Sequence, residues 1–355
     1  MSDVLRDPTE ATPDRITRLL RDGGRLPRGR VAVVRIQQET SYTSTIVRLA
    51  LSYSEDTPPG MSNRLLLKLS RIDSQQRVVG REQRRSEVVF HTRVATMMPD
   101  PPVVRCYHAA FDEESGASHL LFDDAAETHF QTEPSVPPPI RQAASAMEAL
   151  ADFHAFWWDN PALSTIETLP SRESIGEHIA STRASFARFA TSCADALSSE
   201  RLKLYESVLD ALPRLYGRVT GHRNLTLIHG DANFSNVLLP RDAESARSLI
   251  IDWQLWGASF AAEDLSHLIA LFWNQEHRKS MERELLSRYH ERLLRGGPSA
   301  WSWTDLWDDY RLAVILRVLF MPMWFSLAGS PTWRGSLERA MQAFDDLGCR
   351  ELVDP

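Results

Sequence analysis

Residues 225–239 read LTLIHGDANFSNVLL, and this stretch decides the fold. Two apolar runs of the kind that form β-strands enclose His229, Asp231, Asn233 and Asn236. A tight hairpin between such strands needs only about two connecting residues. The additional polar residues therefore indicate a loop that presents functional side chains, and we expect the two strands to form a short hairpin around it.

A further acidic residue follows at the end of another strand-like run. In SLIIDWQ, Asp252 lies 16 residues beyond Asn236 (252 minus 236). Two carboxylates and a carboxamide at strand ends suit phosphoryl transfer, which needs metal ions on the phosphate oxygens and a group that orients the attacking hydroxyl. Mg²⁺ takes hard oxygen ligands of this kind. An isolated HGD also occurs as a simple turn in which the Asp caps the backbone, so the motif needs support from the rest of the chain.

The N-terminal half supplies a sheet. From Val31 to about Asp124 the strand-like runs are VAVVRI, YTSTIVRLALSY, RLLLKLS, VVRCYHAAFD and SHLLFDD, and a helix is expected at residues 80–96. The proline-rich stretch ETHFQTEPSVPPPI marks a boundary, and beyond it apolar residues recur at helical spacing.

This order predicts an α+β fold of the bilobal, protein-kinase-like type. Residues 1–124 would form a nucleotide-binding lobe, an antiparallel sheet with one helix. Residues 125–355 would form a mostly helical lobe that carries the catalytic loop and a substrate pocket. The length of 355 residues suits two such lobes.

Composition narrows the class of protein. A net charge of −7 without a dense basic stripe argues against nucleic-acid binding. The longest apolar run, from Leu312, contains Arg317 and Pro322 and favours a buried helix over a membrane span. A charged N-terminus without an apolar segment argues against a signal peptide, and three widely spaced cysteines favour a reducing cytoplasm without zinc or disulfides.

The pattern HxDxxxxN followed by a strand-end Asp resembles the catalytic loop and metal aspartate of the aminoglycoside phosphotransferase and choline kinase-like family. The stretches IDWQ and EDLSHLIALF look most like its ecdysteroid-kinase-like branch. The resemblance implies that Asp231 is the catalytic base, that Asn236 and Asp252 bind Mg²⁺, and that His229 supports the loop. Asp264 matches the family's downstream aspartate, for which a structural role is expected.

The same resemblance assigns a lysine and a glutamate to the nucleotide phosphates. RLLLKLS places Lys68 in the third strand, and Glu87 follows 19 residues later (87 minus 68) on the expected helix. Glu82 on the same helix is the alternative partner. Taken singly, a lysine such as Lys68 is more often a surface residue of an edge strand whose stem lies along the sheet.

Two further segments complete the nucleotide site implied by the resemblance. SHLLFDDAAE matches the fifth strand and the hinge that holds adenine through its backbone, here Phe122, Asp123, Asp124 and Ala125. The loop QQETSYTST between the first two strands lacks the glycines with which many kinases approach the phosphates. The hydroxyl groups of Ser41, Thr43 and Ser44 could donate hydrogen bonds there instead.

Together these features predict a kinase that transfers the γ-phosphoryl group of ATP or GTP to a hydroxyl group of a small molecule. The alternatives are a catalytically silent nucleotide-binding protein and a protein kinase, although HGD replaces an HRD-type loop and no DFG or APE segment occurs. The acceptor and the oligomeric state stay open. The aromatic and acidic stretch WSWTDLWDDY is a candidate pocket wall for a cationic acceptor. The remaining histidines, among them His91, His154 and His267, receive no role.

Overall fold

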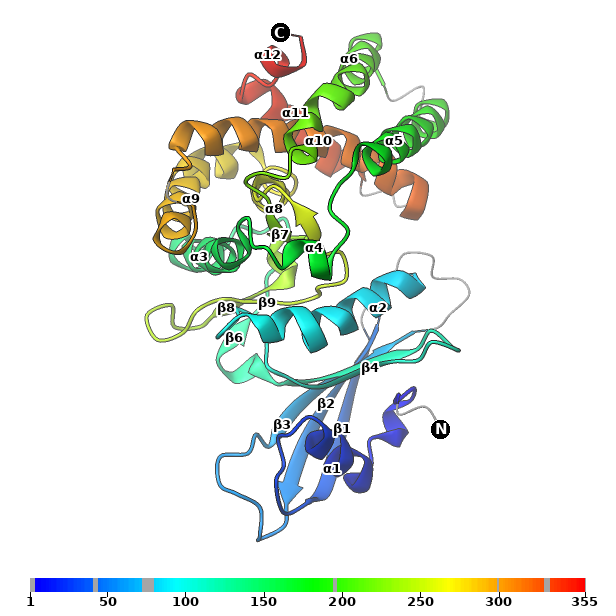
Figure 1. Ribbon diagram of the computed structural model, residues 1–355, viewed down its shortest axis with the longest axis vertical. Helices are drawn as coiled ribbons and strands as arrows, with labels where there is room; N and C mark the ends of the chain where they lie inside the picture. The colour runs from blue at the N-terminus through cyan, green and yellow to red at the C-terminus, as the bar shows by residue number, and fades with distance from the viewer. Residues whose placement is uncertain are drawn as a thin grey trace. The chain divides into compact units, whose positions relative to one another are not determined.

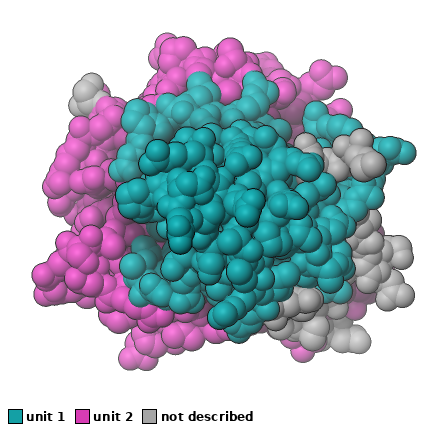
Figure 2. Space-filling model, turned by 90° about the horizontal axis from the view of Figure 1, so that it is seen from below, with its two compact units in different colours: residues 1–129, 249–255 teal, residues 130–248, 256–355 magenta. Residues whose placement is uncertain are grey.

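The computed structural model describes residues 4–40, 44–71, 80–193, 197–298, 300–328 and 333–354. The chain forms two compact units, which Figure 2 colours separately. Unit 1 consists of Met1–His129 and Leu249–Leu255, and unit 2 of Phe130–Ser248 and Trp256–Pro355. Figure 1 shows the helices and strands of both units.

Unit 1 contains a five-stranded antiparallel sheet with the strand order β1-β2-β3-β5-β4. The strands are β1 (Val31–Thr40), β2 (Ser44–Tyr53), β3 (Arg64–Ser70), β4 (Cys106–Phe111) and β5 (Ser118–Asp123). The predicted antiparallel N-terminal sheet is therefore confirmed.

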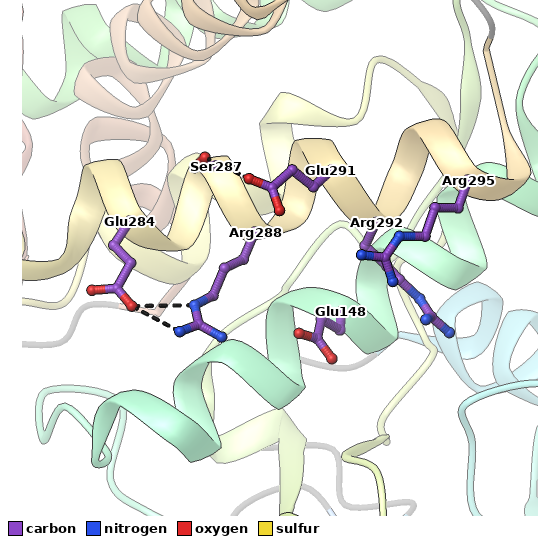
Figure 3. Close-up of a pocket in the computed structure, with 7 residues that line it drawn as sticks. All are labelled: Glu148, Glu284, Ser287, Arg288, Glu291, Arg292 and Arg295. Atoms are coloured by element: carbon purple, nitrogen blue, oxygen red, sulfur yellow. Dashed lines mark hydrogen bonds and ion pairs between the residues drawn. The ribbon is translucent and has the colours of Figure 1, made fainter.

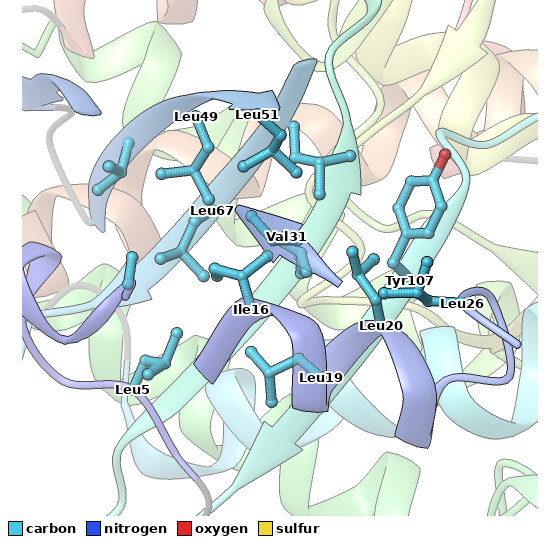
Figure 4. Close-up of a cluster of buried hydrophobic side chains, with 14 of the residues drawn as sticks. Leu5, Ile16, Leu19, Leu20, Leu26, Val31, Leu49, Leu51, Leu67 and Tyr107 are labelled. Atoms are coloured by element: carbon cyan, nitrogen blue, oxygen red, sulfur yellow. The ribbon is translucent and has the colours of Figure 1, made fainter. Parts of the chain in front are cut away.

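One face of this sheet is covered by helix α1 (Pro13–Asp22), which the sequence analysis did not predict (Figure 4). Thr12 caps the helix by accepting a hydrogen bond from the Arg15 backbone N–H, and Pro13 occupies the first helical position. Leu67 and Leu69 of β3 belong to the core on this face. Because neighbouring side chains of a strand point to opposite faces, Lys68 points to the other face. The core also includes Leu5, Ile16, Leu19, Leu20, Leu26, Val31, Leu49, Leu51 and Tyr107.

The end of α1 approaches the sheet through a glycine. A Cβ atom on Gly23 would lie 1.9 Å from the Tyr107 carbonyl oxygen, a distance that no side chain tolerates. Gly23 therefore allows the close packing of α1 against β4.

The predicted helix at residues 80–96 is present but is not uniform. It begins as α2 (Arg81–Val89), continues as the π-helical turn η2 (Phe90–Val94) and ends as the 3₁₀ turn η3 (Ala95–Met97). Glu87 and Val88 are buried, whereas Glu82 is exposed. Wider turns of this kind inside helices are frequent near functional sites.

Unit 2 is mostly helical, as predicted. Helix α3 packs against α9, and α10 contacts α5, α8 and α11. The helices are α3 (Ile140–Trp157), α4 (Leu163–Ile166), α5 (Arg172–Ser192), α6 (Ser199–Leu215), α7 (Gly217–Thr220), α8 (Ala262–Ile269), α9 (Gln275–Gly296), α10 (Trp303–Ala328), α11 (Trp333–Asp346) and α12 (Arg350–Val353). In the part of the chain that the structure describes, no helix is both long and hydrophobic enough to cross a membrane.

The expectation of a hairpin around the HGD loop is wrong. Strand β7 (Thr226–Ile228) pairs antiparallel with β10 (Gly257–Ser259), whereas β8 (Val237–Pro240) lies in a different sheet. The loop ends in the 3₁₀ turn η6 (Phe234–Asn236), which is capped by the side chain of Asn233 and turns the chain away from β7. The local sequence cannot predict that β7 pairs with β10, because the two strands are far apart in the chain.

Candidate active site

In unit 1, Lys68 forms a partly buried ion-pair cluster with two carboxylates. Its Nζ donates to Glu87 Oε1 and Oε2 at 2.7 and 2.8 Å, and to Asp252 Oδ1 at 2.5 Å. Burial alone would lower the pKa of Lys68, but the charges of Asp252 and Glu87 outweigh it and raise the pKa above its ordinary value. The lysine is therefore a fixed positive charge, and Glu87, not Glu82, is its helical partner.

Asp252 is held in place by the residues around it. Strand β9 (Leu249–Ile250) forms a parallel bridge with Val103, and the Ile250 N–H donates to the Pro102 carbonyl at 2.8 Å. Asp252 itself has φ +66°, a left-handed conformation that Asp tolerates better than most residues. The next residue, Trp253, is buried and stacks on Phe90 at a centroid distance of 4.1 Å. The indole thus fixes the backbone beside the carboxylate.

His91 lies on the π-helical turn next to this cluster. Its ring makes an edge contact with Phe122 at a centroid distance of 4.9 Å, and its Nδ1 has no hydrogen-bond partner among the described residues. Burial and, to a smaller extent, the positive charge of Lys68 together lower the pKa of His91 to about 3. His91 is therefore a neutral ring at neutral pH.

The predicted hinge lies at the end of β5 and in the turn η4 (Ala125–Glu127). Two of its amides are already used, since Asp123 N donates to Arg105 O at 3.0 Å and Asp124 N to Arg64 O at 3.2 Å. The Asp124 carboxylate caps η4 and pairs with Arg48 at 2.7 Å. The N–H of Ala125 makes no hydrogen bond within the described residues, so it remains available to a ligand.

Of the hydroxyl groups proposed for the first loop, only Ser44 can be located. It is buried at the start of β2. Ser41 and Thr43 lie outside the residues that the structure describes.

In unit 2, Asp264 of α8 holds the backbone of the HGD loop. Its Oδ2 accepts a hydrogen bond from the His229 N–H at 2.6 Å, and its Oδ1 accepts one from the Gly230 N–H at 3.0 Å. Gly230 has φ +81°, which glycine adopts without strain. His229 Nδ1 in turn accepts from the Asp231 N–H at 3.2 Å. These contacts fix the direction in which the Asp231 side chain leaves the loop.

Asp264 is itself deeply buried and well partnered. His154 Nε2 lies 3.2 Å from Asp264 Oδ2, and His154 Nδ1 lies 2.8 Å from the Tyr289 hydroxyl. Burial raises the pKa of Asp264, but the hydrogen bonds and charges of His154 and His229 outweigh it, so the pKa lies below its ordinary value. The residue is an ionised structural clamp, as the resemblance implied.

The Asp231 carboxylate faces three side-chain donors. Asn233 Nδ2 lies 3.3 Å from Oδ1, His267 Nε2 lies 3.2 Å from Oδ1, and Asn236 Nδ2 lies 3.1 Å from Oδ2. Burial raises the pKa of Asp231, but His267, His229 and Asn236 together bring it below its ordinary value. Asp231 is therefore ionised at neutral pH and partly accessible, with 28% of its side chain exposed.

The oxygen atoms of Asn236 and Asp252 suit Mg²⁺. The Asn236 amide nitrogen donates to Asp231 O at 2.9 Å as well as to its carboxylate, which leaves the amide oxygen without a partner among the described residues. Asp252 keeps Oδ2, whose only neighbour in the described residues is Gln254 Nε2 at 3.4 Å. No group of three or more His, Cys, Asp or Glu side chains in the described chain forms a metal cluster. The carboxamide oxygen of Asn236 in unit 2 and the carboxylate oxygen of Asp252 in unit 1 are each a hard ligand of the kind that Mg²⁺ takes.

A surface pocket of about 370 Å³ lies elsewhere in unit 2, between α3 and α9 (Figure 3). Its glutamates and arginines balance in charge, and Arg288 pairs with Glu284 at 3.0 Å. None of the predicted site residues lines it, so it carries no assignment. The lining residues are Glu148, Glu284, Ser287, Arg288, Glu291, Arg292 and Arg295.

The aromatic stretch WSWTDLWDDY is occupied by partners from its own unit. The Arg283 guanidinium lies 5.6 and 5.3 Å from the ring centroids of Trp303 and Trp307. Asp309 forms a two-pronged ion pair with Arg218 at 2.7 and 2.8 Å. Arg283 and Arg218 thus contact part of this stretch, and its role as a pocket wall for a cationic acceptor stays a prediction.

The fold and these two groups of residues define a protein of the kinase-like class. The profile of the ecdysteroid kinase-like family matches residues 38–296, and the chain belongs to this family. No curated protein matches the chain significantly.

Solved structures share the fold at low sequence identity. An aminoglycoside phosphotransferase-like protein from Ralstonia eutropha is 14% identical with a TM-score of 0.54, and 98% of each chain is covered. Choline kinase from Cryptosporidium parvum is 10% identical with a TM-score of 0.53, and 90% of each chain is covered. The GDP complex of an aminoglycoside 2′-phosphotransferase IIIa variant is 12% identical with a TM-score of 0.53, covering 90% of this chain and 93% of that one. At these identities the likeness establishes the fold alone.

The predicted site residues thus assemble in two groups. Lys68, Glu87 and Asp252 meet in unit 1, and Asp231 and Asn236 meet in unit 2. Nothing in the local sequence around His91 or His267 indicates the contacts that these two histidines make. A histidine on an apolar helix has no local signal that separates a core residue from a functional one.

Proposed function

We propose that the protein is a small-molecule kinase that transfers the γ-phosphoryl group of ATP or GTP to a hydroxyl group of its substrate. The observation that carries this proposal is the Asp231 carboxylate, which is ionised and partly accessible, accepts hydrogen bonds from Asn233 and Asn236, and faces His267. Membership of the ecdysteroid kinase-like family and the GDP bound by a protein of the same fold support it.

Residues 1–124 would bind the nucleotide in this proposal. Lys68 would neutralise the phosphates, oriented by Glu87, and the free N–H of Ala125 would hydrogen-bond adenine. Phe122, Asp123 and Asp124 would form the rest of the hinge. Ser41 and Ser44 would approach the phosphates in place of glycines.

Asn236 and Asp252 would hold one Mg²⁺ through the oxygen atoms that are not engaged elsewhere. The ion would neutralise the negative charge of the phosphates, as in other phosphoryl-transfer enzymes. Lys68 contacts Oδ1 of Asp252, so the lysine would compete with the metal for this one carboxylate oxygen only.

Residues 125–355 would bind the acceptor and present its hydroxyl to Asp231. The hydroxyl oxygen forms a bond to the γ-phosphorus while the bond to the bridging oxygen breaks, and the nucleoside diphosphate leaves with that electron pair. The hydroxyl proton passes to Asp231 and then to solvent. Because a carboxylate with a lowered pKa is a weak base, its main contribution is to orient the hydroxyl, with proton transfer late in the reaction.

The sequence argues against the two alternative functions. A silent nucleotide-binding protein is disfavoured because Lys68, Glu87, Asp231, Asn236 and Asp252 are all present. A protein kinase is disfavoured because the chain lacks DFG and APE segments. The three free thiols suit a reducing cytoplasm, where we place the reaction.

The test is a screen of hydroxylated metabolites and antibiotics for acceptor-dependent release of ADP or GDP. Asp231→Asn should keep nucleotide affinity within about threefold and lose a factor of at least about 100 in kcat. Calorimetry would measure the affinity of the same preparation. Turnover by the variant at the wild-type rate would exclude the role of Asp231, and phosphorylation of generic proteins instead of small molecules would favour the protein kinase.

A further inference from the structure

Helix α8 presents two polar residues, Asp264 and His267, to the HGD loop. Asp264 and His267 are three residues apart, so both lie on one side of the helix. Asp264 binds the backbone of the loop, whereas His267 Nε2 faces the side chain of Asp231 at 3.2 Å. His267 is almost fully buried, with 1% of its surface exposed.

The tautomer of His267 follows from its other neighbour. Arg317 Nη1 lies 3.0 Å from His267 Nδ1. A guanidinium can only donate hydrogen bonds, so Nδ1 must be the acceptor and the ring proton of the neutral form resides on Nε2. Burial lowers the pKa of His267 although Asp231 acts in the opposite direction, which agrees with a neutral ring.

Arg317 is in turn fixed from α8. Its Nη2 donates to Glu263 Oε2 at 2.9 Å, and Glu263 also accepts from the Ser259 hydroxyl. Glu263, Arg317 and His267 therefore form one continuous chain of polar contacts that ends at Asp231. All of its members lie in unit 2.

The N–H of Nε2 makes no aligned hydrogen bond within the described residues. An unsatisfied donor at this depth is costly and rare in native proteins. Asp231 Oδ1 is the acceptor within reach, and hydrogen bonds at active sites often align only when ligand is bound. A histidine that served packing alone would not need a fixed tautomer aimed at a carboxylate.

The contacts of Asp231 leave one position open. A carboxylate accepts about four hydrogen bonds, two on each oxygen. Asn233 and His267 face Oδ1 and Asn236 faces Oδ2, so the remaining position is on Oδ2. An acceptor hydroxyl that approaches Asp231 would therefore meet Oδ2.

We propose that His267 is a positioning residue that engages Oδ1 of Asp231 and so reserves Oδ2 for the acceptor hydroxyl, with Arg317 setting the tautomer that makes this possible. The proposal rests on the proposed function, in which Asp231 orients a hydroxyl group. It adds a residue to which neither the resemblance nor the sequence pattern gave a role.

The first experiment needs no activity. Nitrogen-15 NMR of histidine-labelled full-length protein should show His267 neutral, with the proton on Nε2, and Asp231→Asn should shift that resonance. Arg317→Met should populate the other tautomer, while His277→Gln on the exposed start of α9 should change neither signal. A charged ring, a proton on Nδ1, or no response to Asp231→Asn would overturn the proposal.

The second experiment uses a matched pair of amides. His267→Gln places an N–H close to the position of Nε2, whereas His267→Asn can still accept from Arg317 but is too short to reach Asp231. With MgATP and water as the acceptor, the Asn variant should release ADP about ten- to a hundredfold more slowly, and the Gln variant should retain most of the rate. The affinity for MgADP, measured by calorimetry, should stay within about twofold in both because His267 touches no nucleotide.

The results of these experiments distinguish a failure of the proposal for His267 from a failure of the proposed kinase function. Equal rates for the two variants, or equal losses of nucleotide affinity, would show that His267 is structural only. If the wild-type protein neither binds MgATP nor releases ADP with any acceptor, the proposed function fails. The NMR result then still decides whether His267 engages Asp231.

Discussion

Lys68 Nζ lies 2.5 Å from Asp252 Oδ1, although the two residues are 184 positions apart in the sequence. The same ammonium group also contacts both oxygens of Glu87. Strand β3 and Asp252, the proposed metal ligand, are therefore connected through Lys68 in the absence of a nucleotide. Four predictions follow from this cluster and from other buried groups.

Lys68→Met should lower both stability and nucleotide affinity. It leaves Glu87 and Asp252 facing each other without a counter-charge, which should reduce the free energy of unfolding by about 3 kcal/mol. The double variant Lys68→Met with Glu87→Gln should recover part of that loss, but not the affinity for ATP. Urea denaturation and calorimetry measure the two effects, and Lys203→Met, at an exposed position of α6, is the control. Recovery of both properties in the double variant would contradict the role of Lys68.

Asp252→Asn should remove the dependence of nucleotide binding on Mg²⁺. In the wild-type protein, affinity for ATP should fall about tenfold or more when EDTA replaces Mg²⁺, since in the proposed site the ion would join the Asp252 carboxylate to the phosphates. In the variant the two affinities should be similar. Asp56→Asn, an exposed aspartate of unit 1, should behave like the wild type. An unchanged Mg²⁺ effect in Asp252→Asn would refute the metal assignment.

Asp264→Asn should destabilise the loop that carries Asp231. The amide keeps one acceptor oxygen but sets an NH₂ group against a backbone donor, so the free energy of unfolding should fall by about 2–4 kcal/mol. Hydrogen exchange should quicken at His229 and Gly230, whose amides Asp264 binds. Asp210→Asn makes the same change on an exposed side chain and should leave both measurements unaltered.

The buried His119 should make stability depend on pH below neutrality. Burial, with a smaller effect of His108, lowers the pKa of His119 to about 3, whereas an unfolded histidine titrates near 6.5. Between these values the unfolded chain binds more protons, so stability rises with pH by up to about 1.4 kcal/mol per unit and is level above about 6.5.

His119→Gln tests this dependence because it removes the titrating ring. The slope of unfolding free energy between pH 5 and 6.5 should be smaller in the variant by up to that amount, about 1.4 kcal/mol per unit. The two proteins should show parallel curves above pH 7. An identical slope in the acidic range would mean that His119 is not the group responsible.

Local patterns were enough to predict the sheet and the helical unit, because alternation and helical spacing report directly which face of an element is buried. Lys68 also pairs with Glu87 as expected, because the periodicity of the strand and of the helix determines the face on which each side chain lies. The role of the HGD loop and of Asp252 in catalysis stays a prediction.

Features that depend on distant residues were not predictable. Strand β7 finds its partner in β10, and no local feature of Gly257–Ser259 announces a strand. Arg317, 50 positions away from His267, sets the tautomer of that histidine. In the sequence, Arg317 indicates only that its apolar run is not a membrane span. Helix α1 is short and rich in arginine, so its apolar stripe is brief, although Thr12 and Pro13 did mark its start.

Helix α1 has a practical consequence for anyone who shortens this protein. Ile16, Leu19 and Leu20 seal the side of the sheet opposite Lys68. A version beginning at Val31 would leave a row of leucines on β2 and β3 open to water, and such patches promote self-association. Shortened versions should therefore keep Pro13–Asp22, and forms without this helix should precipitate even though every residue of the proposed chemistry would remain.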